Sequence, residues 1–108
     1  MGNSLIAKFK ITTANTKVQL QNITSTSISW GDGATTSGKL THTYTNAGEY
    51  ECSIENITTI GWKAFANCTS LVSVIIPDSV TTIEAQVFMD CTNLTSVTIS
   101  NRITTIDT

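Results

Sequence analysis

The sequence predicts a mainly β protein in which a small β-sandwich, residues 1–55, continues directly into a short solenoid of repeats, residues 56–108, that carries short helical turns. The composition supports this class, because the chain is rich in Thr, a β-branched residue that suits pleated strands, and only 13% of its residues are charged. Short runs of alternating apolar and polar residues fill the first half. A fixed period of 23 residues fills the second half.

The first half contains five runs that we expect to be short strands. They are residues 5–12, 17–20, 27–30, 40–44 and 49–55. In the first run Phe9 and Ile11 should face inward, and in the last Tyr50, Cys52 and Ile54 alternate with polar residues, which indicates one buried and one solvated face. Turns between them at such short intervals suggest a small β-sandwich.

The repeat in the second half begins at Ile60, Ile83 and Ile106, so that two full copies are followed by a truncated third. The copies align at six apolar positions: Phe65 with Phe88, Cys68 with Cys91, Leu71 with Leu94, Val74 with Val97, Ile76 with Ile99, and Val80 with Ile103. We expect Phe65 and Phe88 to be equivalent buried plugs. A period in the twenties with Leu-x-x-Val-x-Ile in each copy is the signature of a leucine-rich-repeat solenoid.

Each copy should contain a turn or two of helix followed by a short strand. The apolar residues at helical spacing in the first copy are Ile60, Ala64, Phe65, Cys68 and Leu71. Val74 and Ile76 are then the inward residues of the strand. No linker precedes the repeats, so the run at 49–55 is expected to act as the zeroth rung of the solenoid and to cover its first coil.

Two resemblances to known families rest on these residues. WGDG at 30–33, HTY at 42–44 and GEY at 48–50 resemble the pattern of PKD-type domains, which implies an immunoglobulin-like sandwich in which Trp30, Asp32, His42 and Tyr44 are structural. The match covers about residues 5–55 and is shorter than that family's usual domain, which implies one or two missing strands. The pattern IGxxAFxxCxxLxxVxIPxxVTxI closely resembles BspA-like leucine-rich repeats over residues 57–108.

The BspA-like resemblance implies a function as well as a fold. That family consists of bacterial and protist surface proteins, several of them adhesins, so the chain is expected to be a non-catalytic cell-surface or secreted binding module, and a fragment of a longer repeat protein. The alternative is a structural spacer or cap of a surface or phage protein with no ligand of its own. The ligand, protein or glycan, is not specified by any motif.

Charge and hydropathy argue against two classes of partner, nucleic acid and the lipid bilayer. The net charge of −2 and the absence of a basic stripe argue against nucleic acid. No apolar run reaches the ~20 residues that span a bilayer, so membrane insertion is not expected. The first residues lack the apolar core and cleavage site of a signal peptide.

No catalytic or metal-binding constellation emerges, and neither an enzyme nor a cofactor is expected. His42 is the only histidine, and it is interpreted as a side chain bonded to the Gly31-Asp32-Gly33 turn or to a neighbouring strand rather than as a catalytic base. Asp32 is one carboxylate, far short of the 6–8 oxygens that Ca²⁺ takes, so it is interpreted as stabilising that turn.

Three further groups of residues are singled out. Cys68 and Cys91 occupy one slot in successive copies and are expected to be buried thiols, with a disulfide as the alternative if their Cα atoms lie within about 4.4–6.8 Å. Trp62 aligns with Ala85, so it either packs against the sandwich at the junction or is exposed and contacts a ligand. The open end of the second copy is lined by Phe88, Leu94, Val97, Ile99 and Ile103, and a symmetric homodimer through that end is expected.

Overall fold

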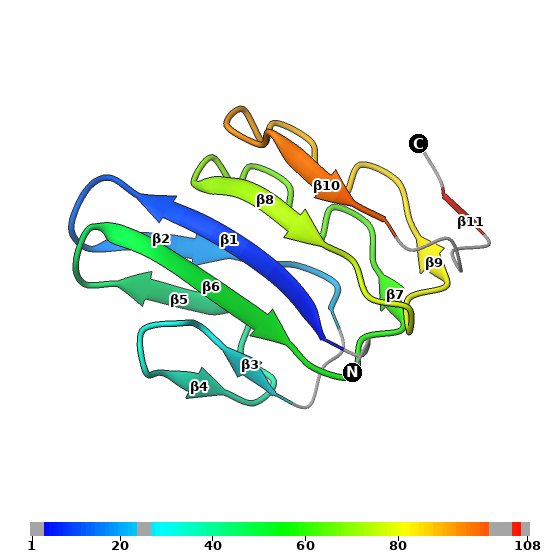
Figure 1. The fold of residues 1–108 in the computed structure, drawn as a ribbon, viewed down its shortest axis with the longest axis horizontal. Helices are drawn as coiled ribbons and strands as arrows, with labels where there is room; N and C mark the ends of the chain where they lie inside the picture. Colours follow the sequence, from blue (N-terminus) through cyan, green and yellow to red (C-terminus); the bar gives the residue numbers. More distant parts are fainter. Residues whose placement is uncertain (1–3, 24–26, 100–104, 107–108) are drawn as a thin grey trace.

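The computed structural model describes residues 4–23, 27–99 and 105–106. The described part of the chain is mainly β and contains no helix (Figure 1). Its strands are β1 (Leu5–Ile11), β2 (Thr16–Gln19), β3 (Ile28–Ser29), β4 (Thr35–Thr36), β5 (Thr41–Tyr44), β6 (Gly48–Ile54), β7 (Thr59–Ile60), β8 (Leu71–Ile75), β9 (Thr82–Ile83), β10 (Ser96–Thr98) and β11 (Thr105–Ile106). The alternating runs of the first half therefore do form strands, and β4 lies between the third and the fourth of these runs.

The largest sheet runs through both halves of the chain in the order β10-β8-β1-β6-β3-β4 (Figure 1). β1 is antiparallel to β6 on one edge, from Leu5 opposite Ile54 to Ile11 opposite Gly48. On its other edge β1 is antiparallel to β8, with Ala7 opposite Val74. Leu5, Ala7, Phe9 and Ile11 alternate along β1 and are all buried, so the inner face of the sheet is apolar across its centre.

The first coil of the repeats is covered by β1, and the expectation that the run at 49–55 would be the zeroth rung is wrong. β6 pairs with β1 and β3, and β1 lies between it and β8. The alternation in the sequence specifies which face of each strand is buried, but it does not specify which strand is the neighbour. The pairing of β1 with β8 shifts by one residue between Lys8, which lies opposite Ser73, and Phe9, which lies opposite Leu71.

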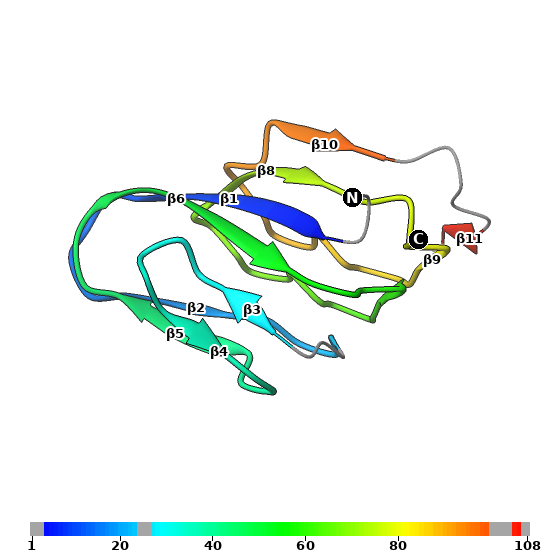
Figure 2. The same cartoon turned by 60° about the horizontal axis from the view of Figure 1, so that its bottom comes forward.

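A second, two-stranded sheet of β2 and β5 lies beneath the β1–β6 part of the large sheet (Figure 2). Val18 and Tyr44 of the small sheet are buried with Phe9 and Trp30. The same core cluster continues through Phe65, Val80 and Val87 into the repeats. Because one apolar core spans both halves, neither half buries its inner surface alone.

The two repeat copies stack in parallel, and the predicted 23-residue period is confirmed by the strand registers. Val74 in β8 lies opposite Val97 in β10. In the three-stranded sheet β11-β9-β7, Ile60 lies opposite Ile83, and Ile83 opposite Ile106. Residues one period apart therefore pair in both ladders, as a stack of equivalent coils requires.

The turns between these strands are not helical, contrary to the expectation from apolar spacing. Lys63 and Asn67 in the first copy have left-handed backbone, with φ of 57° and 62°, and Gln86 and Asp90 repeat this in the second copy, with φ of 59° and 58°. A left-handed residue at every fourth position interrupts an α-helix, because successive i to i−4 hydrogen bonds require right-handed residues throughout. The segments instead form linked turns.

Residues 19–22 pack on the turns of the first copy and bond to them through the backbone. The first copy bonds to the turns of the second copy in the same way. The Gln21 N–H donates to the carbonyl of Ala64 at 3.0 Å, and one coil later the Phe65 N–H donates to the carbonyl of Val87 at 2.9 Å. Together with β1 on β8, this segment closes the N-terminal end of the repeat stack. The cap is therefore assembled from two separate pieces of the first half.

Candidate functional site

The residues of the WGDG, HTY and GEY motifs form one aromatic column. The Trp30 ring stacks on His42 with centroids 5.0 Å apart, and the His42 ring meets Tyr44 edge-on at 4.8 Å. Tyr44 in turn stacks on Tyr50 at 4.4 Å and donates its hydroxyl to the Trp30 carbonyl at 2.7 Å. The motifs thus bring their residues together to bind one another.

Asp32 closes the turn at the head of this column. Its Oδ2 lies 2.7 Å from His42 Nε2, and its Oδ1 accepts the Ala34 N–H at 3.1 Å. Burial raises the pKa of the Asp32 carboxyl, but the hydrogen bonds from His42 and Ala34 outweigh it and hold the pKa below its usual value. The structure therefore pairs His42 with Asp32. This is the contact expected if His42 bonds to the Gly31-Asp32-Gly33 turn and Asp32 stabilises that turn.

The equivalent phenylalanines of the two copies stack, with ring centroids 5.8 Å apart and planes inclined by 15°. They are not equally buried. Phe65 is fully buried, whereas Phe88 is only partly buried, and Leu71 and Leu94 differ in the same way. The expectation of equivalent plugs is corrected accordingly, because Phe65 is covered by residues on both sides of its coil and Phe88 by the first copy on one side.

All three cysteines are free, so the disulfide alternative for Cys68 and Cys91 is wrong. The Cys91 Sγ–H donates to the Phe65 carbonyl at 2.9 Å, and the Cys68 Sγ lies 3.6 Å from the Gln19 carbonyl. Burial raises the pKa of the Cys68 thiol to about 12 and also raises that of Cys91. Each thiol ties its coil to the segment that precedes it in the stack.

Trp62 is exposed, and its backbone is held at both ends. The residue is 48% exposed, whereas Trp30 is fully buried. The Trp62 N–H donates to Glu84 Oε1 at 2.9 Å, and its carbonyl accepts from Asn22 Nδ2 at 2.6 Å. Trp62 therefore lies at the junction with about half of its surface in contact with solvent, and both interpretations, packing against the sandwich and contact with a ligand, stay predictions.

Gly61 allows this junction to form. A Cβ atom at residue 61 would lie 2.1 Å from the carbonyl oxygen of Asn22 and 2.7 Å from its Cβ, far inside contact distance. Sequence reasoning missed Gly61, Asn22 and Glu84 as neighbours of Trp62. A signal existed, because Gly61 and Trp62 align with Glu84 and Ala85 and so depart from the repeat at two consecutive positions.

A hollow of about 440 Å³ lies beside Trp62. Its lining is mostly polar and consists of Asn22, Thr58, Thr59, Gly61, Trp62 and Glu84. The Lys63 ammonium sits 4.5 Å from the centroid of the Trp62 ring, within the range of a cation–π contact. The hollow therefore combines an exposed indole with hydroxyl, amide and carboxylate groups.

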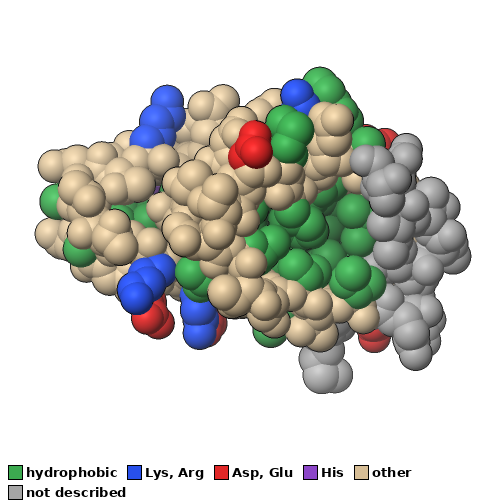
Figure 3. All heavy atoms as spheres, turned by 90° about the horizontal axis from the view of Figure 1, so that it is seen from above, with side chains coloured by type: hydrophobic (Ala, Val, Ile, Leu, Met, Phe, Trp, Pro, Cys, Tyr) green, Lys and Arg blue, Asp and Glu red, His purple; other side chains and the backbone are tan. Residues whose placement is uncertain are grey.

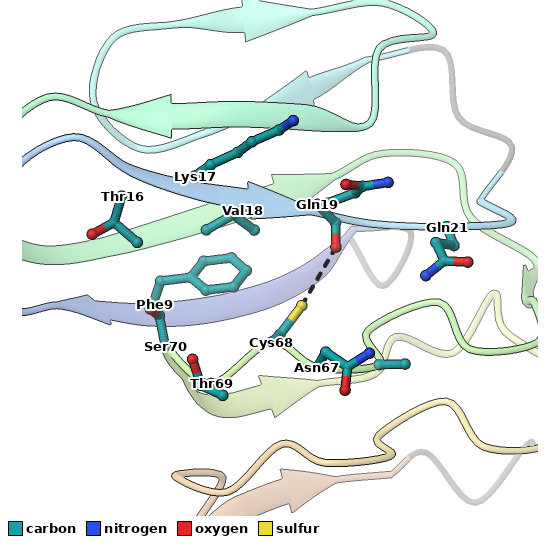
Figure 4. Close-up of a pocket in the computed structure, with 11 residues that line it drawn as sticks. Phe9, Thr16, Lys17, Val18, Gln19, Gln21, Asn67, Cys68, Thr69 and Ser70 are labelled. Carbon is teal, nitrogen blue, oxygen red and sulfur yellow. Dashed lines mark hydrogen bonds between the residues drawn. The ribbon is translucent and has the colours of Figure 1, made fainter.

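A second hollow, of about 320 Å³, lies between β2 and the turn at residues 66–70 (Figure 4). Gln19 and Gln21 line one side of it, and Asn67 and Thr69 line the other. Its aromatic neighbour, Phe9, is fully buried. This hollow is a polar gap between the cap and the first coil, and it offers no exposed aromatic ring.

Hydrophobic side chains gather on the face seen from above in Figure 3, beside the residues drawn in grey. β10 is the edge strand on this side of the large sheet. Val97 is partly buried and Ile99 is 46% exposed, while Ile103 lies outside the described residues. Ile76, the counterpart of Ile99 in the first copy, is buried.

Three findings concern metal sites, membrane spans and the only histidine. Within the described residues, no three His, Cys, Asp or Glu side chains lie together as a metal site. They include no helix, and hence none that could cross a bilayer. The contacts of His42 among them are Asp32, Trp30 and Tyr44, and so include none of the Ser, Cys or Thr side chains that a histidine base activates.

Comparison with known proteins gives one match. The model of the BspA type leucine rich repeat region, a region of six copies, matches residues 38–108. The match extends upstream of the 23-residue copies and includes β5 and β6. Neither a curated protein nor a solved structure matches the chain significantly. Since the family model covers more than half of the sequence, the chain belongs to the BspA-type leucine-rich-repeat family.

Proposed function

We propose that the chain is a non-catalytic binding module of a cell-surface or secreted protein, and that it contacts its ligand through Trp62. Leucine-rich repeats are in general interaction modules without catalytic activity, and the BspA type is often associated with surfaces and adhesion. The single observation that carries the proposal is the exposed indole on a fixed backbone. Large aromatic side chains dominate binding energy when they are held in place, since little conformational freedom is then lost.

The proposed arrangement is a PKD-like sandwich that caps a short BspA-type solenoid. The aromatic column built by Trp30, His42, Tyr44 and Tyr50 supports the PKD-like part, because it joins all three motifs of that resemblance. The parallel ladders of the two copies support the solenoid. In this arrangement the cap supplies Asn22 and the repeats supply Glu84, and the two together fix Trp62.

Binding to a panel of extracellular-matrix proteins and to a glycan array tests the proposal. We expect at least one probe to bind, and Trp62→Ala to weaken that binding at least about tenfold. Ile75→Ala is the matched control, since Ile75 is 51% exposed but lines neither hollow beside the cap.

Two results would contradict the proposal. Binding that is equally strong in Trp62→Ala would place the contact elsewhere on the molecule. Failure of the wild-type chain to bind any probe would favour the structural spacer.

A further inference from the structure

The hollow beside Trp62 has a composition that selects among ligand classes, and this inference rests on the proposed function. Its lining contains one aromatic ring, two threonines, one amide and one carboxylate. Its volume of about 440 Å³ falls within the ~300–1,000 Å³ of small-molecule sites. The hollow is thus large enough for a ring-sized ligand with several hydrogen-bonding groups.

The fold does not require an indole at residue 62. The equivalent residue one repeat later is Ala85, and both Trp62 hydrogen bonds that fix the junction are made by backbone atoms. Trp30 shows the contrast, since its ring is fully buried and its Nε1–H donates to Thr36 Oγ1 at 2.9 Å. The Trp62 ring is therefore a side chain presented to solvent at a place where the backbone cannot move away.

The charges around the hollow balance. Glu84 supplies the one carboxylate of the lining, whose other residues are neutral, and Lys63, which is not part of the lining, holds one ammonium over the Trp62 ring. A site for an anion or a cation concentrates charge of the opposite sign, which this hollow does not do. An apolar side chain of a protein partner would meet hydroxyl and amide groups and leave them unpaired, at a cost of ~1–3 kcal/mol for each group that becomes buried.

A neutral sugar residue can pack against the apolar indole face and also hydrogen-bond to the polar side chains of the hollow. Its C–H groups carry slight positive charge and lie well against the electron-rich face of an indole. Its hydroxyls both donate and accept, and so can pair with the side chains of Thr58, Thr59, Asn22 and Glu84. We infer that the hollow formed by Asn22, Thr58, Thr59, Gly61, Trp62 and Glu84 binds a neutral sugar residue of a glycan.

Titration of the chain with a set of neutral oligosaccharides, followed by tryptophan fluorescence and calorimetry, tests this inference. We expect at least one to bind and to change the emission of Trp62, and we expect Trp62→Ala to lose both the emission change and at least about tenfold in affinity, although Trp30 remains. Ile75→Ala should bind as the wild type does. Binding should also be insensitive to ionic strength, because no net charge is neutralised.

Two charge variants separate a neutral ligand from a charged one. Glu84→Gln keeps an oxygen that can accept the Trp62 N–H, and Lys63→Met keeps the aliphatic stem over the ring. For a neutral sugar we expect the affinities of both variants to be as insensitive to ionic strength as that of the wild type. Weakening of wild-type binding by salt that Glu84→Gln removes would indicate a cationic ligand, and weakening by salt that Lys63→Met removes would indicate an anionic one. Either result would overturn the inference.

The failure of this inference and that of the proposed function are distinguishable. If the chain binds matrix proteins or charged glycans through Trp62 but no neutral oligosaccharide, the proposed function stands and the sugar assignment is wrong. If neutral oligosaccharides bind equally to Trp62→Ala, the assigned hollow is wrong. If no probe of any class binds, both are wrong.

Discussion

Phe88 stacks on Phe65 with ring centroids 5.8 Å apart, yet only Phe65 is fully buried. We expect Phe65→Ala to lower the free energy of unfolding by ~3–5 kcal/mol, the range for a large side chain removed from a core. Phe88→Ala should cost clearly less, because part of its ring is already in contact with water. Urea denaturation of both variants measures the difference. Equal costs would mean that the second coil is as well covered as the first.

The two halves of the chain should unfold in one cooperative transition. β1 is bonded to β6 on one edge and to β8 on the other, and one core cluster spans both halves. Ile28→Val and Ile76→Val each remove one buried methylene, at ~0.5–1.5 kcal/mol, from opposite halves. Each should shift the same calorimetric peak. Two separate peaks, each moved by one variant only, would show that β1 does not couple the halves.

The Asp32–His42 pair should make stability depend on pH at the acid end. The pKa of Asp32 is lower in the folded chain than in the unfolded one, so its contribution is present above the unfolded pKa of about 3.9 and is lost as the pH falls through the folded value. We expect the melting temperature of Asp32→Asn to fall less than that of the wild type between about pH 5 and pH 2. Parallel curves for the two proteins would contradict this role.

The three thiols should react in order of their exposure. Burial raises the pKa of Cys52 and of Cys68 to about 12, and Cys91 is only half-buried. We expect a thiol reagent at about pH 8 to label Cys91 first, as followed by mass spectrometry of the intact protein and its peptides. In denaturant all three should label at similar rates. Native labelling of Cys68 as fast as Cys91 would show that the first coil opens readily.

The β10 edge should pair with a second copy of the chain. β8 already accepts an antiparallel neighbour in β1, so a repeat strand can be covered by a strand of opposite direction. Two β10 strands related by two-fold symmetry would meet in that way and cover Val97 and Ile99. We expect light scattering to show concentration-dependent dimers that Val97→Asp abolishes. Ile75→Asp is the control, because β8 is paired on both edges; a monomer at every concentration would refute the pairing.

The sequence specified the repeats well, because a period depends only on residues one copy apart. Val74 opposite Val97 and Ile60 opposite Ile83 follow directly from the 23-residue offset. The position of β1 between β6 and β8 could not be predicted from the sequence. Antiparallel strands far apart in the chain pair without any repeated sequence pattern that would identify them as neighbours. The left-handed turns were missed because Lys63 and Gln86 are not residue types that signal positive φ, although Asn67 and Asp90 are.

The candidate site was only partly predictable. Comparison of the copies marked Trp62 as unnecessary to the repeat, but the hydrogen bond that its carbonyl accepts comes from Asn22, in a segment far away in the sequence. The motifs around Asp32 and His42 identified a cluster whose members do contact one another. What the motifs could not indicate is that the contacts of this cluster do not include Trp62, which is held by Asn22 and Glu84 instead.

The central position of β1 also affects how the chain is made. β1 leaves the ribosome before β6 and β8, but Ile6 needs Ser53 on one side and Ile75 on the other before both of its edges are paired. Closing such long loops costs entropy before any contact repays it, and topologies of this kind fold slowly. Until β8 has been synthesised, β1 is a strand without its full set of neighbours and is open to pairing with other nascent chains. Lys8 and Lys10 alternate with its buried residues and would oppose that pairing by charge until Glu51 and Glu49 of β6 lie opposite them.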